Sequence, residues 1–97
     1  MIESFANGGT EDVFDGINSA AARKTLPRDL WKIAFRKLDQ IDAATILDDL
    51  RIPPGNRLEP LRADREGQHS IWINEKYRIC FIWTDSGAVN VEIIDYH

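Results

Sequence analysis

Residues 77–97 read Tyr-Arg-Ile-Cys-Phe-Ile-Trp-Thr-Asp-Ser-Gly-Ala-Val-Asn-Val-Glu-Ile-Ile-Asp-Tyr-His, and their alternation predicts the central part of the architecture. Apolar and polar residues alternate on both sides of Asp85-Ser86-Gly87, a period of two that is typical of an antiparallel hairpin. The preceding residues repeat the pattern, separated by Asn74-Glu75-Lys76. The sequence therefore predicts a three-stranded antiparallel meander, with strands at Gln68–Ile73, Tyr77–Trp83 and Ala88–Ile94.

The register of this meander follows from its two apolar rows. Polar Asn90 and Glu92 interrupt the apolar residues of the last strand, so the odd positions should face the core. A slip by one residue would place Glu92 in the core, which fixes the pairing. A three-residue loop, with glycine last, then joins the strands. The predicted pairs are Ile79 with Ile93, Phe81 with Val91, Trp83 with Val89, Ile71 with Ile79, and Trp72 with Arg78.

The same register gathers chemistry-bearing side chains on the non-core face of the sheet. Trp72, Lys76, Arg78 and Tyr96 should share that face. Arg78 and Tyr96 become diagonal neighbours, about 7–8 Å apart at the backbone and within reach of long side chains. His97 has the opposite parity, but a residue at the end of the strand can turn toward the others. An arginine beside a Tyr-His pair suits RNA cleavage without a metal, because it combines a cation for the phosphate with two proton-transfer groups.

The residues before the meander predict helices. Met1–Phe5 is a candidate short strand, and Thr10 is a candidate N-cap for a helix with acidic residues in its first turn. Pro27 suits the first position of a clearer helix. Asp42–Leu50 continues as a second helical segment, which Pro53–Asn56 stops. The clearer helix carries apolar residues at helical spacing, at Leu30, Ile33, Ala34, Leu38 and Ile41.

These elements predict an α+β domain, a helical hairpin packed on a small antiparallel sheet. The 97 residues should form one domain, 1–97. Residues 1–5 lack the pattern of a signal peptide, and no apolar run approaches the roughly 20 residues that span a bilayer. We therefore expect a cytoplasmic protein with no membrane association. The single cysteine, Cys80, excludes an internal disulfide framework and a cysteine zinc site, and we predict neither metal nor cofactor.

The charge distribution leaves a nucleic-acid partner open. The net charge of −4 disfavours binding to phosphates, which relies on Lys and Arg. The basic residues nevertheless gather in residues 23–37 and 51–78, and the acidic ones in residues 1–15, 39–49 and 85–95. A basic surface beside acidic ones is compatible with this distribution. Ordinary solvated charge is the alternative.

Each candidate residue also has a structural interpretation. Arg78 either stabilises a phosphate whose charge grows in the transition state or forms a surface salt bridge with Glu92 or Asp95. Tyr96 is either a proton-transfer group or a packing aromatic, and His97 either a catalytic or a solvated residue. Trp72 is an exposed apolar residue, a partner contact or a platform for base stacking.

Upstream of the meander, Glu59, Arg62 and Arg65 allow two interpretations as well. They are either solvated charges or, functionally, a proton acceptor and two phosphate-binding cations. We expect His69 to be a satisfied, partly buried residue and Cys80 to pack in the interior.

Together these residues resemble the HigB group of the RelE-like toxin superfamily, toxins of bacterial type II toxin–antitoxin modules. Residues 38–44, followed by Leu50-Arg51, resemble the family's helical segment. The likeness is strongest from Arg57 onward. Its runs are Arg57-Leu58-Glu59-Pro60-Leu61-Arg62, Asp64-Arg65-Glu66-Gly67, Ser70-Ile71, Tyr77-Arg78-Ile79-Cys80-Phe81 and Asp95-Tyr96-His97.

The resemblance implies a microbial RNase-like fold and metal-free cleavage of mRNA in the ribosomal A site. It implies that Arg78 stabilises the phosphate, while Tyr96 and His97 orient the RNA and assist proton transfer. Arg62 stands where the family commonly has lysine. Glu59 stands where some members have histidine, so the identity of the general base stays open.

The implied partners are a helix-turn-helix antitoxin of the HigA type, the 70S ribosome and mRNA. Arg62, Arg65, Trp72 and Lys76 are the expected RNA-binding residues. Lys32, Arg36, Arg51 and Arg57 are the expected ribosome contacts. Two alternatives remain, a ParE-like toxin that inhibits gyrase and a non-catalytic binding module. The Tyr96-His97 pair favours the nuclease, because gyrase binding requires no proton transfer.

Overall fold

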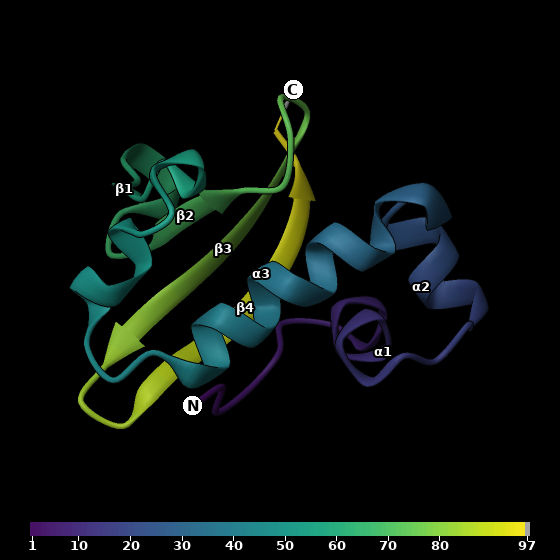
Figure 1. The fold of residues 1–97 in the computed structure, drawn as a ribbon, viewed down its shortest axis with the longest axis horizontal. Helices are drawn as coiled ribbons and strands as arrows, with labels where there is room; N and C mark the ends of the chain where they lie inside the picture. The colour runs from purple at the N-terminus through teal and green to yellow at the C-terminus, as the bar shows by residue number, and fades with distance from the viewer. Residues whose placement is uncertain (97) are drawn as a thin grey trace.

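The sheet has four antiparallel strands in the order β1-β2-β3-β4. The computed structural model describes residues 1–96. The three predicted strands are confirmed, and a short additional strand pairs with the first of them through Glu59 and Pro60. Helices cover one face of the sheet (Figure 1), which confirms the α+β prediction. The strands are β1 Glu59–Pro60, β2 His69–Trp72, β3 Tyr77–Thr84 and β4 Gly87–Asp95.

The predicted register holds at one end of the meander and fails at the other. Three predicted pairs are confirmed, namely Ile79 with Ile93, Ile71 with Ile79, and Trp72 with Arg78. The pairs predicted for Phe81 with Val91 and Trp83 with Val89 are wrong, because a bulge interrupts the ladder. Beyond it the pairs are Ile82 with Val89, Trp83 with Ala88, and Thr84 with Gly87.

The bulge has a local cause in β4. Asn90 adopts the left-handed conformation at φ 53°, which asparagine tolerates better than most residues. One extra residue is thereby inserted in β4, and the side chains beyond it change faces. Ala88 rather than Val89 is buried as a result. The connecting loop has two residues, Asp85 and Ser86, instead of the predicted three.

The first residues run beside β4, as Figure 1 shows, but they form no regular strand. Two isolated parallel bridges join Ile2 to Ala88 and Phe5 to Val91. The Glu3 N–H donates to the Ala88 carbonyl at 2.7 Å. The strand expected at Met1–Phe5 is therefore reduced to these bridges.

Helix α1 spans Gly8–Asp15, and its N-cap is Asn7 rather than Thr10. The Asn7 Oδ1 accepts the Thr10 N–H at 2.8 Å, so the predicted cap lies within the first turn. Thr10 is fully buried, and its hydroxyl oxygen accepts the Ile93 N–H at 3.0 Å. The residue expected to begin the helix thus ties the helix to β4.

Helix α2, Ala20–Thr25, was not predicted, because its six residues are too short for a periodic signal. Helix α3 spans Trp31–Ala43. A 3₁₀ turn at Arg28–Leu30 precedes α3, so Pro27 begins that turn and not the helix. Along α3, Ala34, Leu38 and Ile41 are buried against the sheet, as the spacing predicted.

The second helical segment expected at Asp42–Leu50 is wrong. Helix α3 ends at Ala43, and a 3₁₀ turn follows at Leu47–Arg51. The Asp49 carboxylate accepts the Thr45 N–H at 2.9 Å and the Ile46 N–H at 3.3 Å. These bonds satisfy donors that a continuing helix would direct to its own carbonyls, so the chain turns instead. Further 3₁₀ turns span Pro54–Asn56 and Ala63–Arg65.

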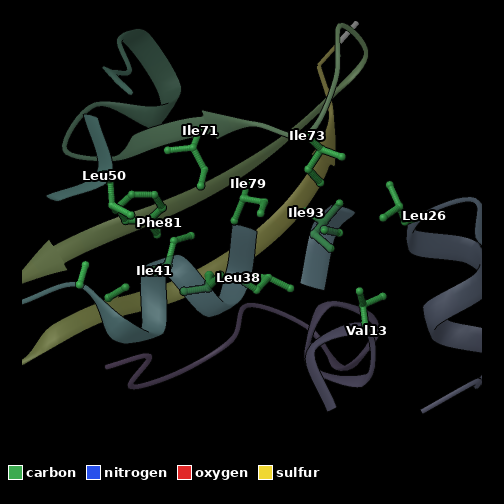
Figure 2. Close-up of a cluster of buried hydrophobic side chains, with 14 of the residues drawn as sticks. Val13, Leu26, Leu38, Ile41, Leu50, Ile71, Ile73, Ile79, Phe81 and Ile93 are labelled. Carbon is green, nitrogen blue, oxygen red and sulfur yellow. The ribbon is translucent and has the colours of Figure 1, made fainter. Parts of the chain in front are cut away.

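The core lies between α3 and the sheet. In Figure 2, Leu38 and Ile41 from α3 lie near Ile79, Phe81 and Ile93 from the strands. All five are at most 4% exposed. Within residues 1–96, no helix is long and apolar enough to cross a membrane.

Candidate functional site

The sheet face opposite α3, called here the outer face, carries the predicted cluster. The register that buries Ile79 and Ile93 points Trp72 and Arg78 to this face. The Tyr96 N–H donates to the Lys76 carbonyl at 2.7 Å, which extends the β3–β4 pairing past the end of β4. The sequence-predicted meeting of Arg78 with Trp72 and Tyr96 therefore occurs.

Three of these side chains, together with Arg57, form an arginine–aromatic stack, defined as Arg57, Trp72, Arg78 and Tyr96. The Arg78 Cζ lies 3.8 Å from the Trp72 ring centroid and 4.8 Å from the Tyr96 ring centroid. The Arg57 Cζ lies 4.0 Å from the Trp72 centroid. Guanidinium groups over indole and phenol faces at such distances make favourable cation–π contacts.

Hydrogen bonds fix Arg78 at one end only. Its Nη1 donates to the carbonyls of Asn74 at 2.6 Å, Glu75 at 3.0 Å and Tyr77 at 3.3 Å. The Nε atom is buried without a hydrogen-bond partner among residues 1–96. The whole residue is 6% exposed. The turn between β2 and β3 therefore holds the guanidinium by its Nη1 atom.

Arg78 has no carboxylate partner within the part of the chain that the structure describes. The two acids considered as its salt-bridge partners bind other cations: Glu92 binds Arg65 at 3.2 Å, and Asp95 binds Lys76 at 3.6 Å. The salt-bridge interpretation of Arg78 is therefore wrong. A buried arginine is ordinarily paired with an acid. Here carbonyls and rings surround the charge, which leaves it available to an anion.

The segment between β1 and β2, residues 61–68, crosses the outer face and is called the cross-sheet loop. Its Arg65 reaches from the β1 side of the sheet to Glu92 on β4 and also donates to Gln68 Oε1 at 3.1 Å. Two small residues of the outer face, Ser70 and Cys80, are fully buried. Arg65 also acts electrostatically on Cys80, which places this loop over that part of the outer face.

The pKa of Cys80 reflects how little water reaches this part of the outer face. Burial raises the pKa of its thiol to about 11. Arg65 and Arg78 oppose that rise, whereas Glu92 adds to it. A neutral thiol packed in the interior agrees with the sequence expectation for this residue.

An open pocket lies between the cross-sheet loop and the end of β4. Its volume is about 260 Å³, and Tyr96 forms one wall. Arg62 on the loop is exposed there, whereas Arg65 is half-buried in its ion pair. The pocket lining is Leu61, Arg62, Ala63, Asp64, Arg65 and Tyr96.

Comparison with known proteins identifies the family of this chain. The profile of the family "RelE-like toxin of type II toxin-antitoxin system HigB" matches residues 3–97. The chain belongs to this family. Type II membership implies an antitoxin partner for this HigB-like toxin.

Two named relatives are similar to the HigB-like chain. Toxin HigB-1 of Vibrio cholerae is 45% identical over 67 residues, which cover 69% of this chain and 70% of the relative. Endoribonuclease HigB of Proteus vulgaris is 32% identical over 98 residues, which cover both chains completely. An uncharacterized protein of Haemophilus influenzae is 38% identical over 72 residues, covering 74% of this chain and 70% of that protein.

Other predicted site residues of this HigB-like toxin lie near the stack without joining it. Glu59 pairs with Ser70, so it shares the outer face with Arg78, but β2 separates the two. Lys76 is exposed in the β2–β3 turn, 5.5 Å from the Tyr77 ring centroid. His97 lies outside the described residues.

The four expected ribosome contacts separate into two groups. Lys32 and Arg36 are exposed on α3, and Arg51 is exposed in an ion pair with Asp48 at 3.1 Å. Arg57 instead belongs to the arginine–aromatic stack, a position that the sequence analysis did not assign to it. The sequence offered one signal for this position. Arg57 precedes Glu59 by two residues, and residues two apart in an extended chain point to the same face, which for Glu59 is the outer face.

His69 departs from its expected role as a satisfied residue. It is half-buried, and its Nδ1 is buried without a hydrogen-bond partner among residues 1–96. Burial lowers the pKa of His69, and Arg51 lowers it further. Its ring stacks on Phe81 with centroids 6.4 Å apart, on the core side of the sheet.

Proposed function

We propose that this toxin is an endoribonuclease that cuts mRNA in the ribosomal A site without a metal and so stops translation and growth. The printed name of the Proteus vulgaris relative, an endoribonuclease, supports the reaction class. The residues of the outer face support the chemistry. The single observation that carries the proposal is the buried Arg78 charge, which has no carboxylate partner within residues 1–96 and lies against Tyr96.

An uncompensated cation beside a phenol suits phosphoryl transfer. A preorganised guanidinium in a desolvated place stabilises charge that develops on the phosphate oxygens. Arg78 is preorganised by three carbonyls and two rings. Its Nη2 makes no hydrogen bond to residues 1–96, and in our proposal this nitrogen contacts the phosphate.

The proposed reaction is an internal transesterification. The ribose 2′-oxygen bonds to the adjacent phosphorus while the bond from phosphorus to the 5′-oxygen breaks. The 2′-OH proton passes to a general base, and the departing 5′-oxygen receives a proton from a general acid. The products are a 2′,3′-cyclic phosphate and a 5′-OH.

The proton-transfer roles fall to three residues. We assign Tyr96 and His97 to orienting the RNA and moving protons at the leaving oxygen. Glu59 is the candidate base, because it is exposed on the outer face. A general base must lie within hydrogen-bond reach of the 2′-OH, so this role requires the RNA to cross β2.

In our proposal the RNA strand runs along the outer face, where the exposed cations lie. Arg62 and Lys76 are exposed near Tyr96 and would contact phosphates of the strand. Arg65 would add positive potential next to the pocket while holding the cross-sheet loop to Glu92. Trp72 would complete the RNA site beneath Arg78.

The proposed partners are the 70S ribosome, an mRNA in its A site and an antitoxin of the HigA type, all within the cytoplasm. A nuclease that binds the ribosome need not attract free RNA by its own positive charge. This reconciles the net charge of −4 with an RNA substrate. Lys32, Arg36 and Arg51 would contact ribosomal RNA. Charge reversal of Lys32 and Arg36 should weaken ribosome cosedimentation, and unchanged cosedimentation would remove this surface from the proposal.

The decisive test compares wild type with Arg78→Ala. After induction, sequencing of mRNA 5′ ends should show cuts within codons for the wild type and none for the variant. The matched control is Arg23→Ala, because Arg23 is exposed on α2 and, among residues 1–96, its side chain hydrogen-bonds only to Asn18. Circular dichroism of both purified variants checks the fold.

The outcomes separate the competing functions. Full growth arrest and cleavage by a well-folded Arg78→Ala variant would refute the nuclease site. Growth arrest with intact mRNA and inhibited DNA supercoiling would identify a gyrase inhibitor. Neither arrest nor cleavage by the wild type would identify a non-catalytic module.

Two further variants test the proton-transfer assignment. Positioned acids and bases typically contribute about 10²–10⁴-fold, so Tyr96→Phe and deletion of His97 should each slow cleavage within that range. Glu59→Gln should do the same if Glu59 is the base. A Glu59→Gln variant with the wild-type rate would leave the base to another group.

A further inference from the structure

Both faces of the Trp72 indole are occupied. The Arg57 Cζ and the Arg78 Cζ lie 4.0 Å and 3.8 Å from the ring centroid. Both separations are close to van der Waals contact, so two guanidiniums on one face would overlap. They must lie on opposite faces, with the ring between them. A nucleobase therefore finds no open face on Trp72.

Arg78 needs support of this kind. Its Nη1 is held by carbonyls on the turn, but Nε is buried without a partner among residues 1–96. Hydrogen bonds at one nitrogen leave the guanidinium plane free to pivot about that end. Trp72 on one side and Tyr96 on the other restrict that pivot to the space between two rings.

We propose that Trp72 is a positioning residue that holds the Arg78 guanidinium against the scissile phosphate, and that Arg57 clamps the opposite face of the indole. This inference rests on the proposed function and adds to it. Trp72 then acts through Arg78, and Arg57 acts through Trp72. Arg57 is exposed and its backbone has φ 48°, a left-handed conformation fixed by an N–H bond to the Pro54 carbonyl at 3.1 Å.

The two roles of Trp72 predict different kinetics. A stacking platform binds substrate, so its loss weakens RNA binding. A positioning residue acts on transition-state geometry, and a displacement of about 1 Å at a reacting group lowers the rate roughly 10²-fold. The maximal rate and the half-saturating concentration of a single-turnover reaction separate the two.

The experiment measures single-turnover cleavage of mRNA on programmed 70S ribosomes at varied toxin concentration. Trp72→Leu should lower the maximal rate roughly 10–100-fold, with little change in the half-saturating concentration. Trp72→Phe keeps an aromatic face and should restore the rate to within about 3-fold of wild type. Arg57→Gln should lower the maximal rate less than Trp72→Leu. An unchanged maximal rate with weaker binding in Trp72→Leu would overturn the inference.

Coupling to Arg78 gives a second kinetic criterion. If Trp72 works through Arg78, then Trp72→Leu combined with Arg78→Lys should be hardly slower than Arg78→Lys alone. A double variant whose rate loss equals the product of the losses in the two single variants would contradict the inference. Thermal unfolding of each variant is recorded alongside, and Arg57→Gln, a surface change, serves if Trp72→Leu does not fold.

A structural readout keeps this inference separate from the proposed function. In NMR spectra of the isolated toxin, ring currents of Trp72 and Tyr96 should shift the Arg78 side-chain NεH signal upfield. Trp72→Leu should move it downfield, and Arg57→Gln should move it less. A wild type that cuts no RNA but shows these shifts would refute the nuclease while supporting the stack. An unshifted signal in an active wild type would refute the stack alone.

Discussion

Arg78 and Arg65 lie on the same face of one sheet, yet their surroundings are opposite. Arg65 is paired with Glu92 at 3.2 Å and is about one-third exposed. Arg78 is 6% exposed and, within residues 1–96, contacts carbonyls and rings without any carboxylate. Within residues 1–96 a carboxylate neutralises the charge of Arg65, whereas no carboxylate neutralises that of Arg78.

In our proposal, this difference separates a structural arginine, Arg65, from a functional one, Arg78. A partly exposed ion pair such as Arg65–Glu92 contributes little stability, about 1 kcal/mol or less. Its effect is geometric, because it fastens the cross-sheet loop over Cys80. Burial of an uncompensated cation costs stability, and the fold accepts that cost at Arg78. An anionic ligand is the group that would offset it.

The sharpest test of this comparison exchanges each arginine for lysine. Arg78→Lys removes the planar group that fits between two rings, so cleavage should fall roughly 10²–10³-fold. Arg65→Lys keeps a cation next to Glu92 and should change cleavage only a few-fold. Single-turnover rates on programmed ribosomes measure both. Equal losses in the two variants would contradict the distinction.

The next largest effect concerns Cys80 under the cross-sheet loop. A rise of its pKa from 9.0 to about 11 lowers the thiolate fraction at pH 8 about 100-fold. Alkylation of the folded protein by iodoacetamide should be slower than that of the unfolded protein by at least this factor. Mass spectrometry at timed intervals provides the rates, and equal rates in both states would refute the buried thiol.

The same pKa predicts a dependence of stability on pH. Because the folded thiol holds its proton more tightly than the unfolded one, its contribution is present below pH 9 and lost as pH rises toward 11. Cys80→Ala should lack this loss. Denaturant titrations of the two proteins between pH 8 and pH 11 isolate the effect. A constant difference in unfolding free energy across that range would contradict it.

A smaller effect is expected from breaking the ion pair itself. Glu92→Gln removes one partner of Arg65 and should reduce the unfolding free energy by about 1 kcal/mol or less. Local opening of the cross-sheet loop should then increase Cys80 alkylation by up to about 5-fold. Glu66→Gln, a change on the same loop at an exposed residue, is the control. If the two variants alkylate alike, Arg65–Glu92 does not hold the loop.

The smallest effect is that of salt. At 1 M ionic strength the Debye length is about 3 Å, which weakens a partly exposed pair such as Arg65–Glu92. Contacts of Arg78 with rings and carbonyls are buried and should resist it. Cys80 alkylation should therefore rise slightly with salt while the Arg78 NεH signal stays in place. A salt-dependent shift of that signal would contradict the buried position of Arg78.

The sequence predicted the strand pairs that follow from alternating apolar and polar residues. It did not predict the features that depend on contacts between distant segments. The apolar rows were enough to pair Ile79 with Ile93 and Trp72 with Arg78. The bulge at Asn90 was not predicted, because the apolar residues Val89 and Val91 continue the alternation on either side of it. A single left-handed residue leaves no mark in such a pattern.

The site was predicted in part for the same reason. Parity placed Arg78 near Trp72 and Tyr96, and their contact is confirmed. The cross-sheet loop and the position of Arg57 were not predicted, because both depend on how a segment with no regular period returns over the sheet. Two helix boundaries were mispredicted for a similar reason. Side-chain hydrogen bonds of Asn7 and Asp49 set where the chain enters α1 and where it turns after α3.

The bridges between the first residues and β4 also bear on synthesis in the cell. The Asn90 N–H donates to Ser4 Oγ across 86 positions of the chain. Such a contact cannot form during translation until residue 90 has left the exit tunnel, although the first helices emerge much earlier. Tyr96, which closes over Arg78, emerges later still. The cluster around Arg78 and the contacts of the first residues with β4 therefore assemble only after all of these segments have left the tunnel.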